Sequence, residues 1–101
     1  QEEVALRNYE LMTIHRPELA DDDYRTLVAE TEEFLRSRGS TVLETDLWGK
    51  RRFAYEIKHL HEGFYSVLKF EAEPDVVDDL DRVLLLADLV IRHKIFHLDK
   101  T

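Results

Sequence analysis

The order of two hydrophobic periodicities constrains this chain more than any other feature. Patterns typical of β-strands, in which successive side chains fall on opposite faces, occupy four stretches: residues 7–15, 41–47 continuing through 51–57, 64–71 and 89–98. Apolar residues recur every three to four positions, as in amphipathic helices, over residues 21–37 and again after residue 73. The resulting order, β-α-β-β-α-β, predicts an α+β, ferredoxin-like sandwich: a four-stranded antiparallel sheet with two helices on one face. The other face of the sheet would be open to a partner.

Short signals mark where these elements begin and end. Residues 21–23, three consecutive aspartates, predict an N-cap for the first helix, and Gly39 is suited to follow its last turn. Pro74 favours the first turn of the second helix. Gly49 predicts a bulge or turn within the second strand, and residues 59–63 predict a polar loop that closes a hairpin.

Length and composition indicate one domain. The chain has 101 residues, of which 44% are hydrophobic and 36% charged, which suits a single core. We expect residues 1–101 to form one domain with an ordered core at 7–98 and tails at 1–6 and 99–101. No stretch is long and apolar enough to span a membrane, and the acidic start, Gln1-Glu2-Glu3, does not resemble a signal peptide. The absence of cysteine excludes disulfides and thiolate metal sites and is consistent with a cytoplasmic protein.

The charge is distributed unevenly along the chain. The formal net charge is −8, which by itself argues against nucleic-acid binding. However, residues 17–36 hold seven acids and two bases, and residues 71–88 hold seven acids and one base. These segments, mostly the two predicted helices, therefore carry −11, and the remainder of the chain carries +3. Such asymmetry predicts that the positive charge lies on the open face of the sheet, on its rim or on its loops, away from both helices.

Two basic clusters on predicted strands are candidates for RNA binding. Cations beside aromatic residues suit a nucleic-acid backbone, because guanidinium groups pair with phosphates and rings stack on bases. The alternative is that each cluster is simply a solvated strand face. The candidate RNA-binding residues are Arg7, Lys50, Arg51, Arg52, Arg92 and Lys94.

Several large apolar residues are predicted to lie on the open face. Core packing is the default interpretation of any one of them, but several exposed together would form a surface for a protein partner. The candidates for this surface are Met12, Ile14, Trp48, Tyr65 and Val67.

Catalytic and metal-binding patterns are absent from the sequence. The five histidines form pairs without a third convergent ligand, and they are better explained as solvated or structural residues. His93 alternates with Ile91 and Ile95, so it is expected to face the helices and to need a hydrogen-bond partner. The three glycines form no phosphate-binding loop, and no serine has the local signature of a nucleophile. We therefore expect no enzyme, cofactor, metal or small-molecule substrate.

The most distinctive stretch of the sequence is Trp48-Gly49-Lys50-Arg51-Arg52-Phe53-Ala54-Tyr55-Glu56-Ile57-Lys58. Together with Arg7-Asn8-Tyr9-Glu10 and with residues 62–65 and 88–93, it resembles the bacterial small-subunit ribosomal protein S-six (S6) family, which has a similar basic-x-Tyr-Glu start. The resemblance runs from about residue 7 to residue 98.

This resemblance implies a structural, non-catalytic component of the 30S subunit in the cytoplasm. It implies binding to 16S ribosomal RNA together with ribosomal protein S-eighteen (S18), and we expect the free chain to be monomeric. Two other functions are compatible with the same fold. One is a non-catalytic protein–protein interaction or regulatory module that uses the open face without RNA. The other is an acylphosphatase-like enzyme, although His15-Arg16-Pro17 stands where that enzyme needs a loop containing glycine.

Overall fold

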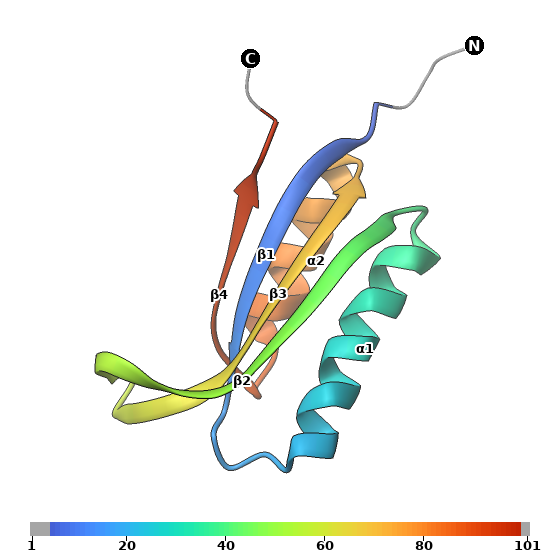
Figure 1. Cartoon of the computed structure of the whole chain (residues 1–101). Helices are drawn as coiled ribbons and strands as arrows, with labels where there is room; N and C mark the ends of the chain where they lie inside the picture. The colour runs from blue at the N-terminus through green and yellow to red at the C-terminus, as the bar shows by residue number, and fades with distance from the viewer. Residues whose placement is uncertain (1–4, 100–101) are drawn as a thin grey trace.

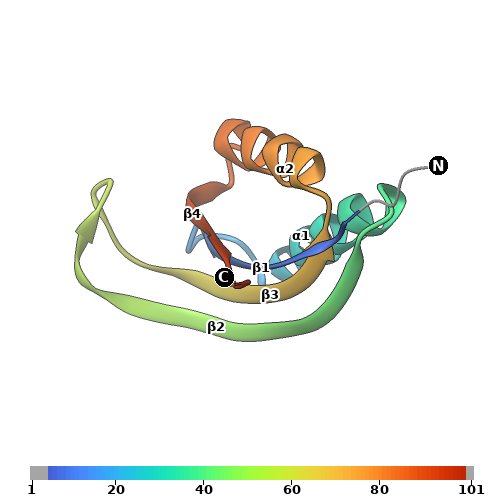
Figure 2. The ribbon, with the colours of Figure 1, turned by 90° about the horizontal axis from the view of Figure 1, so that it is seen from above.

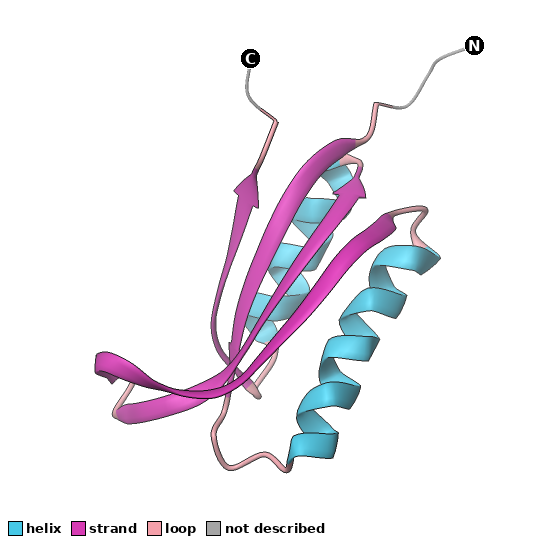
Figure 3. Cartoon of the chain, in the orientation of Figure 1, coloured by secondary structure: helices cyan, strands magenta, loops and turns pink. Residues whose placement is uncertain are grey.

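A computed structural model describes residues 5–99 and contains the predicted elements in the predicted order (Figures 1 and 3). The predictions about residues 1–4 and 100–101 lie outside the described residues. In chain order, the strands and helices are β1 (Arg7–His15), α1 (Asp21–Ser37), β2 (Thr41–Ile57), β3 (Leu60–Ala72), α2 (Pro74–Leu86) and β4 (Val90–His97).

The four strands form one antiparallel sheet in the order β2-β3-β1-β4. Both helices lie on one side of this curved sheet, as Figure 2 shows, which confirms the predicted ferredoxin-like sandwich. In β1, the side chains of Tyr9 and Leu11 pack under the helices, whereas Met12 belongs to the opposite face. Successive side chains of β1 and β3 thus alternate between a helix-covered face and an open face of the sheet.

The helix α1 has the predicted bounds but not the predicted N-cap. Ala20 precedes the helix and provides no side-chain cap hydrogen bond, so the expectation that the aspartates cap it is wrong. Asp21 is instead the first helical residue, and it accepts a hydrogen bond from Arg25 Nε at 2.7 Å one turn later. At the other end Gly39 has φ +83°, the left-handed conformation expected for a glycine that follows a helix.

The hairpin between β2 and β3 is longer than predicted. Its turn consists of only Lys58 and His59, whose φ angles of 50° and 65° are typical of a tight two-residue hairpin turn. Ile57 pairs with Leu60 across this turn, so residues 60–63 belong to β3 and the prediction of a loop there is wrong. Gly49 lies in one of three register irregularities of β2, at the predicted bulge.

The outer part of this hairpin extends past the other strands and curls up at its end (Figure 2). It folds over the end of β1, where Ile57 joins Ile14 and Ile91 in a small second core. Gly63 permits this close approach. A Cβ atom on Gly63 would lie only 2.7 Å from Ile14 Cγ2 and 2.9 Å from the carbonyl oxygen of His15.

Candidate nucleic-acid interface

The open face carries a strip of apolar side chains near the base of the long hairpin. Met12 of β1 and Val67 of β3 are directly opposite each other in the sheet, and both are partly exposed. Beside them, the rings of Trp48 and Tyr65 stack with centroids 5.8 Å apart and planes 14° from parallel. These four residues, Met12, Trp48, Tyr65 and Val67, form the apolar strip of the open face.

The position of Trp48 results from the bulge in β2 and from a contact made through the sheet. The register of β2 shifts between Leu47 and Gly49, so Trp48 is the extra residue that turns onto the open face. On the opposite face, the hydroxyl of Tyr24 donates to the carbonyl oxygen of Tyr65 and accepts from the N–H of Gly49 at 3.3 Å. Burial raises the pKa of Tyr24, which keeps its proton on the hydroxyl for this contact. A residue of α1 therefore stabilises the bulge that presents Trp48, of which 42% is exposed.

Ile14 does not contribute to this strip. Only 2% of it is exposed, because the outer hairpin folds over it and places Ile57 and Gly63 against it. The prediction that Ile14 forms part of an exposed partner surface is therefore wrong. The alternation of β1 places Ile14 on the open face, but there it packs against the outer hairpin and is not exposed.

Three of the predicted RNA-binding residues share the open face with the apolar strip. Lys94 of β4 is opposite Met12, and Arg92 is opposite Ile14. Arg51 of β2 is opposite Gly63, and its guanidinium lies 5.7 Å from the ring centroid of Trp48, within range for a cation–π contact. Each of these three cations is exposed.

The other three cations lie elsewhere. The ammonium of Lys50 is 5.2 Å from the ring centroid of Phe64, whose side chain is on the helix-covered side, so the expectation that Lys50 lies on the open side is wrong. Arg52 alternates with Arg51 and therefore does not share its face. Arg7 is opposite Ala72, at the far end of β1. Strand alternation separates consecutive cations that look like one cluster in the sequence.

Lys69 is an open-face cation that the sequence-based candidates omit. It is opposite Glu10 of β1, is exposed, and its Nζ lies 3.8 Å from a carboxylate oxygen of Glu44. The alternation of side chains along β3, which places Tyr65 and Val67 on the open face, could have identified Lys69 as well. Acidic neighbours surround Lys69. Among residues 5–99, the cations of this face without an ion-pair partner therefore lie nearer the hairpin, at Arg51, Arg92 and Lys94.

Two of the five histidines, His93 and His97, contact other side chains of the fold. The ring of His93 faces α2, and its Nε2 lies 2.7 Å from a carboxylate oxygen of Asp81, the kind of partner that its alternation predicted. His97 stacks on Tyr9, with ring centroids 5.1 Å apart. Within residues 5–99, no group of three or more histidine or carboxylate side chains could hold a metal ion. Over the same residues, neither helix is long and apolar enough to cross a membrane.

The fold and this surface define a class: a ferredoxin-like domain whose uncovered sheet face carries stacked aromatic residues flanked by cations. Comparison with known proteins gives the family. The model of the family described as "Ribosomal protein S6" matches residues 8–97. The chain belongs to the ribosomal protein S6 family, and it is accordingly a protein of the small ribosomal subunit.

Individual relatives agree with this assignment. The chain is 47% identical to small ribosomal subunit protein bS6 of Symbiobacterium thermophilum over 87 residues, which cover 86% of this chain and 92% of the relative. It is 42% identical to bS6 of Carboxydothermus hydrogenoformans over 95 residues, covering 94% and 99%. The crystal structure of 30S ribosomal protein S6 from Thermotoga maritima superposes with a TM-score of 0.86 at 28% identity, covering 92% of this chain and 88% of the other.

Proposed function

We propose that this chain binds 16S ribosomal RNA together with ribosomal protein S18, through its open sheet face and the long hairpin. The observation that carries the proposal is the stack of Trp48 on Tyr65, with Arg51 beside it, at the base of that hairpin. Membership of a small-subunit protein family supports an RNA-containing setting for this surface.

The chemistry of the open face suits single-stranded or irregular RNA. An exposed indole offers a flat ring on which an unpaired base can stack. A guanidinium next to it can form paired hydrogen bonds with phosphate oxygens. We assign these functions to Trp48 and Arg51, with Arg92 and Lys94 as further phosphate contacts. Arg7, Lys50 and Arg52 would contact phosphates only from the edges of the sheet and the hairpin.

The need for a protein partner follows from charge and exposure together. A chain with net charge −8 repels RNA at long range, and a few local cations give only weak binding, with non-specific dissociation constants typically about 10⁻⁴–10⁻⁶ M. A basic partner would reverse the sign of the combined surface. It would also cover Met12 and Val67, which the helices cannot reach. We assign this position to S18.

The test is a titration of a central-domain fragment of 16S RNA at fixed salt, with and without S18. We expect binding to be at least about tenfold tighter when S18 is present, which corresponds to ~1.4 kcal/mol. Equal affinity in both titrations would show that the chain binds RNA independently of S18. No RNA binding in either titration, with S18 still binding the chain, would favour the protein–protein module instead.

A further inference from the structure

The carboxylate of Asp46 lies beside the exposed indole on the open face. The indole Nε1 of Trp48 donates to a carboxylate oxygen of Asp46 at 3.2 Å. Asp46 is opposite Val67 in the sheet and is exposed, so it adjoins the apolar strip. Among the described residues Asp46 has no ion-pair partner, whereas Glu44 of the same strand lies 3.8 Å from Nζ of Lys69. Because each carboxylate oxygen can accept two hydrogen bonds, most of the acceptor capacity of Asp46 is not used by the fold.

A negative charge at this place opposes binding to the RNA backbone. Trp48 and Arg51 are the groups proposed to bind RNA, and a carboxylate beside them repels phosphate. It contributes to binding only if the RNA presents hydrogen-bond donors to it. The unstacked bases of single-stranded RNA carry such donors on their edges. Asp46 is therefore suited to the edge of a base and not to a phosphate.

The contacts of the indole determine how a base approaches it. The ring of Tyr65 stacks on one face of Trp48, and 42% of Trp48 remains exposed, so a base stacks from the other side. The Nε of Arg51 donates to the carbonyl oxygen of Trp48 at 3.2 Å, which keeps the guanidinium near the ring. Asp46 lies at the Nε1 edge of the indole. A base that stacks on this indole can thus turn one edge toward Asp46.

Guanine is the base whose edge matches a carboxylate. Its Watson–Crick edge carries N1–H and the N2 amino group side by side, and these two donors fit two carboxylate oxygens. Adenine and cytosine place a ring-nitrogen acceptor beside their amino group. Uracil places a carbonyl oxygen on each side of its N3–H. In these three bases an acceptor would face a carboxylate oxygen, which repels it.

We propose that Asp46 selects guanine: an unpaired guanine stacks on Trp48 and donates its N1–H and N2–H to the carboxylate of Asp46. This inference rests on the proposed function, because it assigns a base to the same open-face site. The oxygen that accepts from the indole can also accept from the base. Arg51 contacts an adjacent phosphate. The cations of the open face then provide affinity, and Asp46 provides base specificity.

Trp48 is the only tryptophan of the chain, so quenching of its fluorescence reports a base that stacks on it. The test titrates the whole chain, at low salt, with the pentaribonucleotides UUGUU, UUAUU, UUCUU, UUUUU and UUIUU. Inosine (I) resembles guanosine but lacks the N2 amino group. UUGUU should bind at least about tenfold more tightly than UUAUU, whose central purine stacks comparably, and UUIUU should lie between them.

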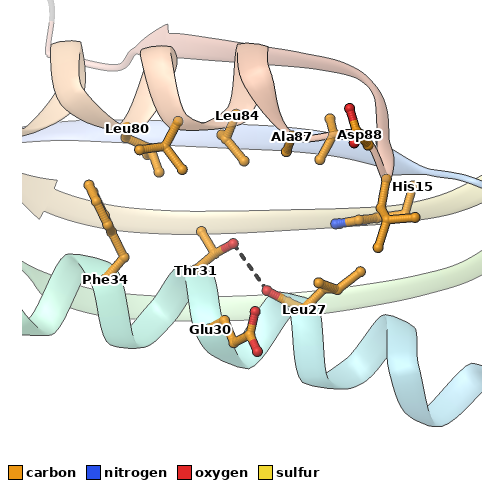
Figure 4. A pocket seen from close by; sticks show the side chains of 12 residues that line it. His15, Leu27, Glu30, Thr31, Phe34, Leu80, Leu84, Ala87 and Asp88 are labelled. Atoms are coloured by element: carbon orange, nitrogen blue, oxygen red, sulfur yellow. Dashed lines mark hydrogen bonds between the residues drawn. The ribbon is translucent and has the colours of Figure 1, made fainter.

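The position of Trp48 makes this signal specific to the open face. The cavity of about 500 Å³ between α1 and α2, shown in Figure 4, lies on the helix-covered side of the sheet, and Trp48 does not line it. A probe that binds in this cavity therefore does not stack on the indole.

Asp46→Asn and a matched control test the contact. Asparagine keeps an acceptor for the indole N–H but replaces one carboxylate oxygen with an NH₂ donor, so the affinity ratio of UUGUU to UUAUU should fall to about one. Glu44→Gln removes the same charge from the same strand, at an exposed position. It should leave the ratio unchanged. A general gain in affinity from the lost negative charge should appear in both variants.

Three results would overturn the proposal. Quenching with equal affinities for all five probes, or a ratio that Asp46→Asn does not change, would show that Asp46 does not read the base. Weaker S18 binding by Asp46→Asn, with an unchanged ratio, would show that Asp46 pairs with a cation of S18 instead. No quenching up to about 1 mM of any probe, well above typical non-specific dissociation constants, would show that bases do not stack on Trp48. The titration of the central-domain RNA fragment with S18 tests the proposed function separately.

Discussion

His15 is the residue whose surroundings differ most from what its chemistry prefers. Its sequence context, at the end of an alternating strand, indicates a strand residue and nothing more. In the structure it is buried beside Tyr24, with ring centroids 5.9 Å apart in an edge-on arrangement. Because a buried imidazole resists protonation, the stability of the folded chain should decrease in acid.

We predict that His15 makes the fold less stable as the pH falls from about 6.5 to about 4. Its pKa is lowered from 6.5 to about 4 in the folded chain, so between these values the unfolded chain binds the proton more readily. The stability present above pH 6.5 is therefore lost on acidification, by about 2–3 kcal/mol near pH 4.5. Urea unfolding at pH 7 and pH 4.5 measures this loss.

His15→Phe should reduce the loss by that amount, whereas His59→Phe should not, because the side chain of His59 is 98% exposed. Carboxylates that titrate in the same range affect all three chains alike. An identical pH dependence in His15→Phe and the unmodified chain would contradict the prediction.

Arg51 is the cation for which the structure gives the clearest RNA-binding geometry. Its Nε donates to the carbonyl oxygen of Trp48 at 3.2 Å, which holds the guanidinium beside the exposed indole. If the proposed function is right, Arg51→Ala should weaken RNA binding in the presence of S18. The dependence of log affinity on log salt should also become shallower by roughly one unit, the effect of one lost phosphate contact.

The matched control is Arg25→Ala, which removes the same charge from α1, where Arg25 is exposed and paired with Asp21. Its salt dependence should equal that of the unmodified chain. An unchanged slope for Arg51→Ala would show that Arg51 does not contact phosphate.

Among the elements, β1 and the part of β3 from residue 64 onward were predictable, and the outer half of the β2–β3 hairpin was not. Strict alternation is sufficient to assign the two faces of β1, because no residue is inserted between Tyr9 and Ile14. In β2, register shifts at three places change which face a residue occupies, and the sequence around Gly49 reveals only one of them. For this reason Lys50, Arg51 and Arg52 could not be assigned to faces from their spacing.

The burial of Ile14 could not be predicted either, since it depends on a segment that follows it by more than forty residues. The outer hairpin covers Ile14 only because β3 carries no side chain at Gly63, where it crosses β1. The sequence shows this glycine but not the atoms that it approaches.

Gly63→Ala should therefore displace the outer hairpin. Its Cβ would lie 2.9 Å from the backbone oxygen of His15, which cannot rotate away as the end of a side chain can. We expect a loss of about 1–3 kcal/mol in the free energy of unfolding, the usual cost of overpacking. Urea denaturation measures the loss, and the methyl resonances of Ile57 should shift as its contact with Ile14 changes.

Gly39→Ala is the comparison. Gly39 has open space around it but a φ of +83°, so alanine there should cost about 1–2 kcal/mol through backbone strain alone. It should leave the Ile57 resonances unchanged. If Gly63→Ala keeps both the stability and the Ile57 resonances of the unmodified chain, the hairpin is not held by this close approach.

For the molecule as a whole, the sheet separates two surfaces of different charge. The acidic helices lie on one side, and the apolar strip with Arg51, Arg92 and Lys94 lies on the other. The net charge of −8 is the sum of the charges on both surfaces, so it does not describe either of them. The distance between each acid and bound RNA, relative to the screening length, decides which acids oppose binding.

Two double variants with the same change in net charge, from −8 to −6, should separate these contributions. Glu33→Gln with Asp78→Asn removes exposed acids from the helices, and Glu10→Gln with Glu71→Gln removes acids from the open face.

The screening length is about 30 Å at 0.01 M salt and about 8 Å at 0.15 M. At 0.01 M, both pairs should therefore strengthen RNA binding, by roughly two- to fivefold. At 0.15 M, the helix pair should lose its effect and the open-face pair should keep most of it. Filter binding of the same RNA fragment with S18, for the unmodified chain and both double variants at the two salt concentrations, measures the six affinities needed. Equal behaviour of the two pairs at 0.15 M would show that the RNA does not lie on the open face.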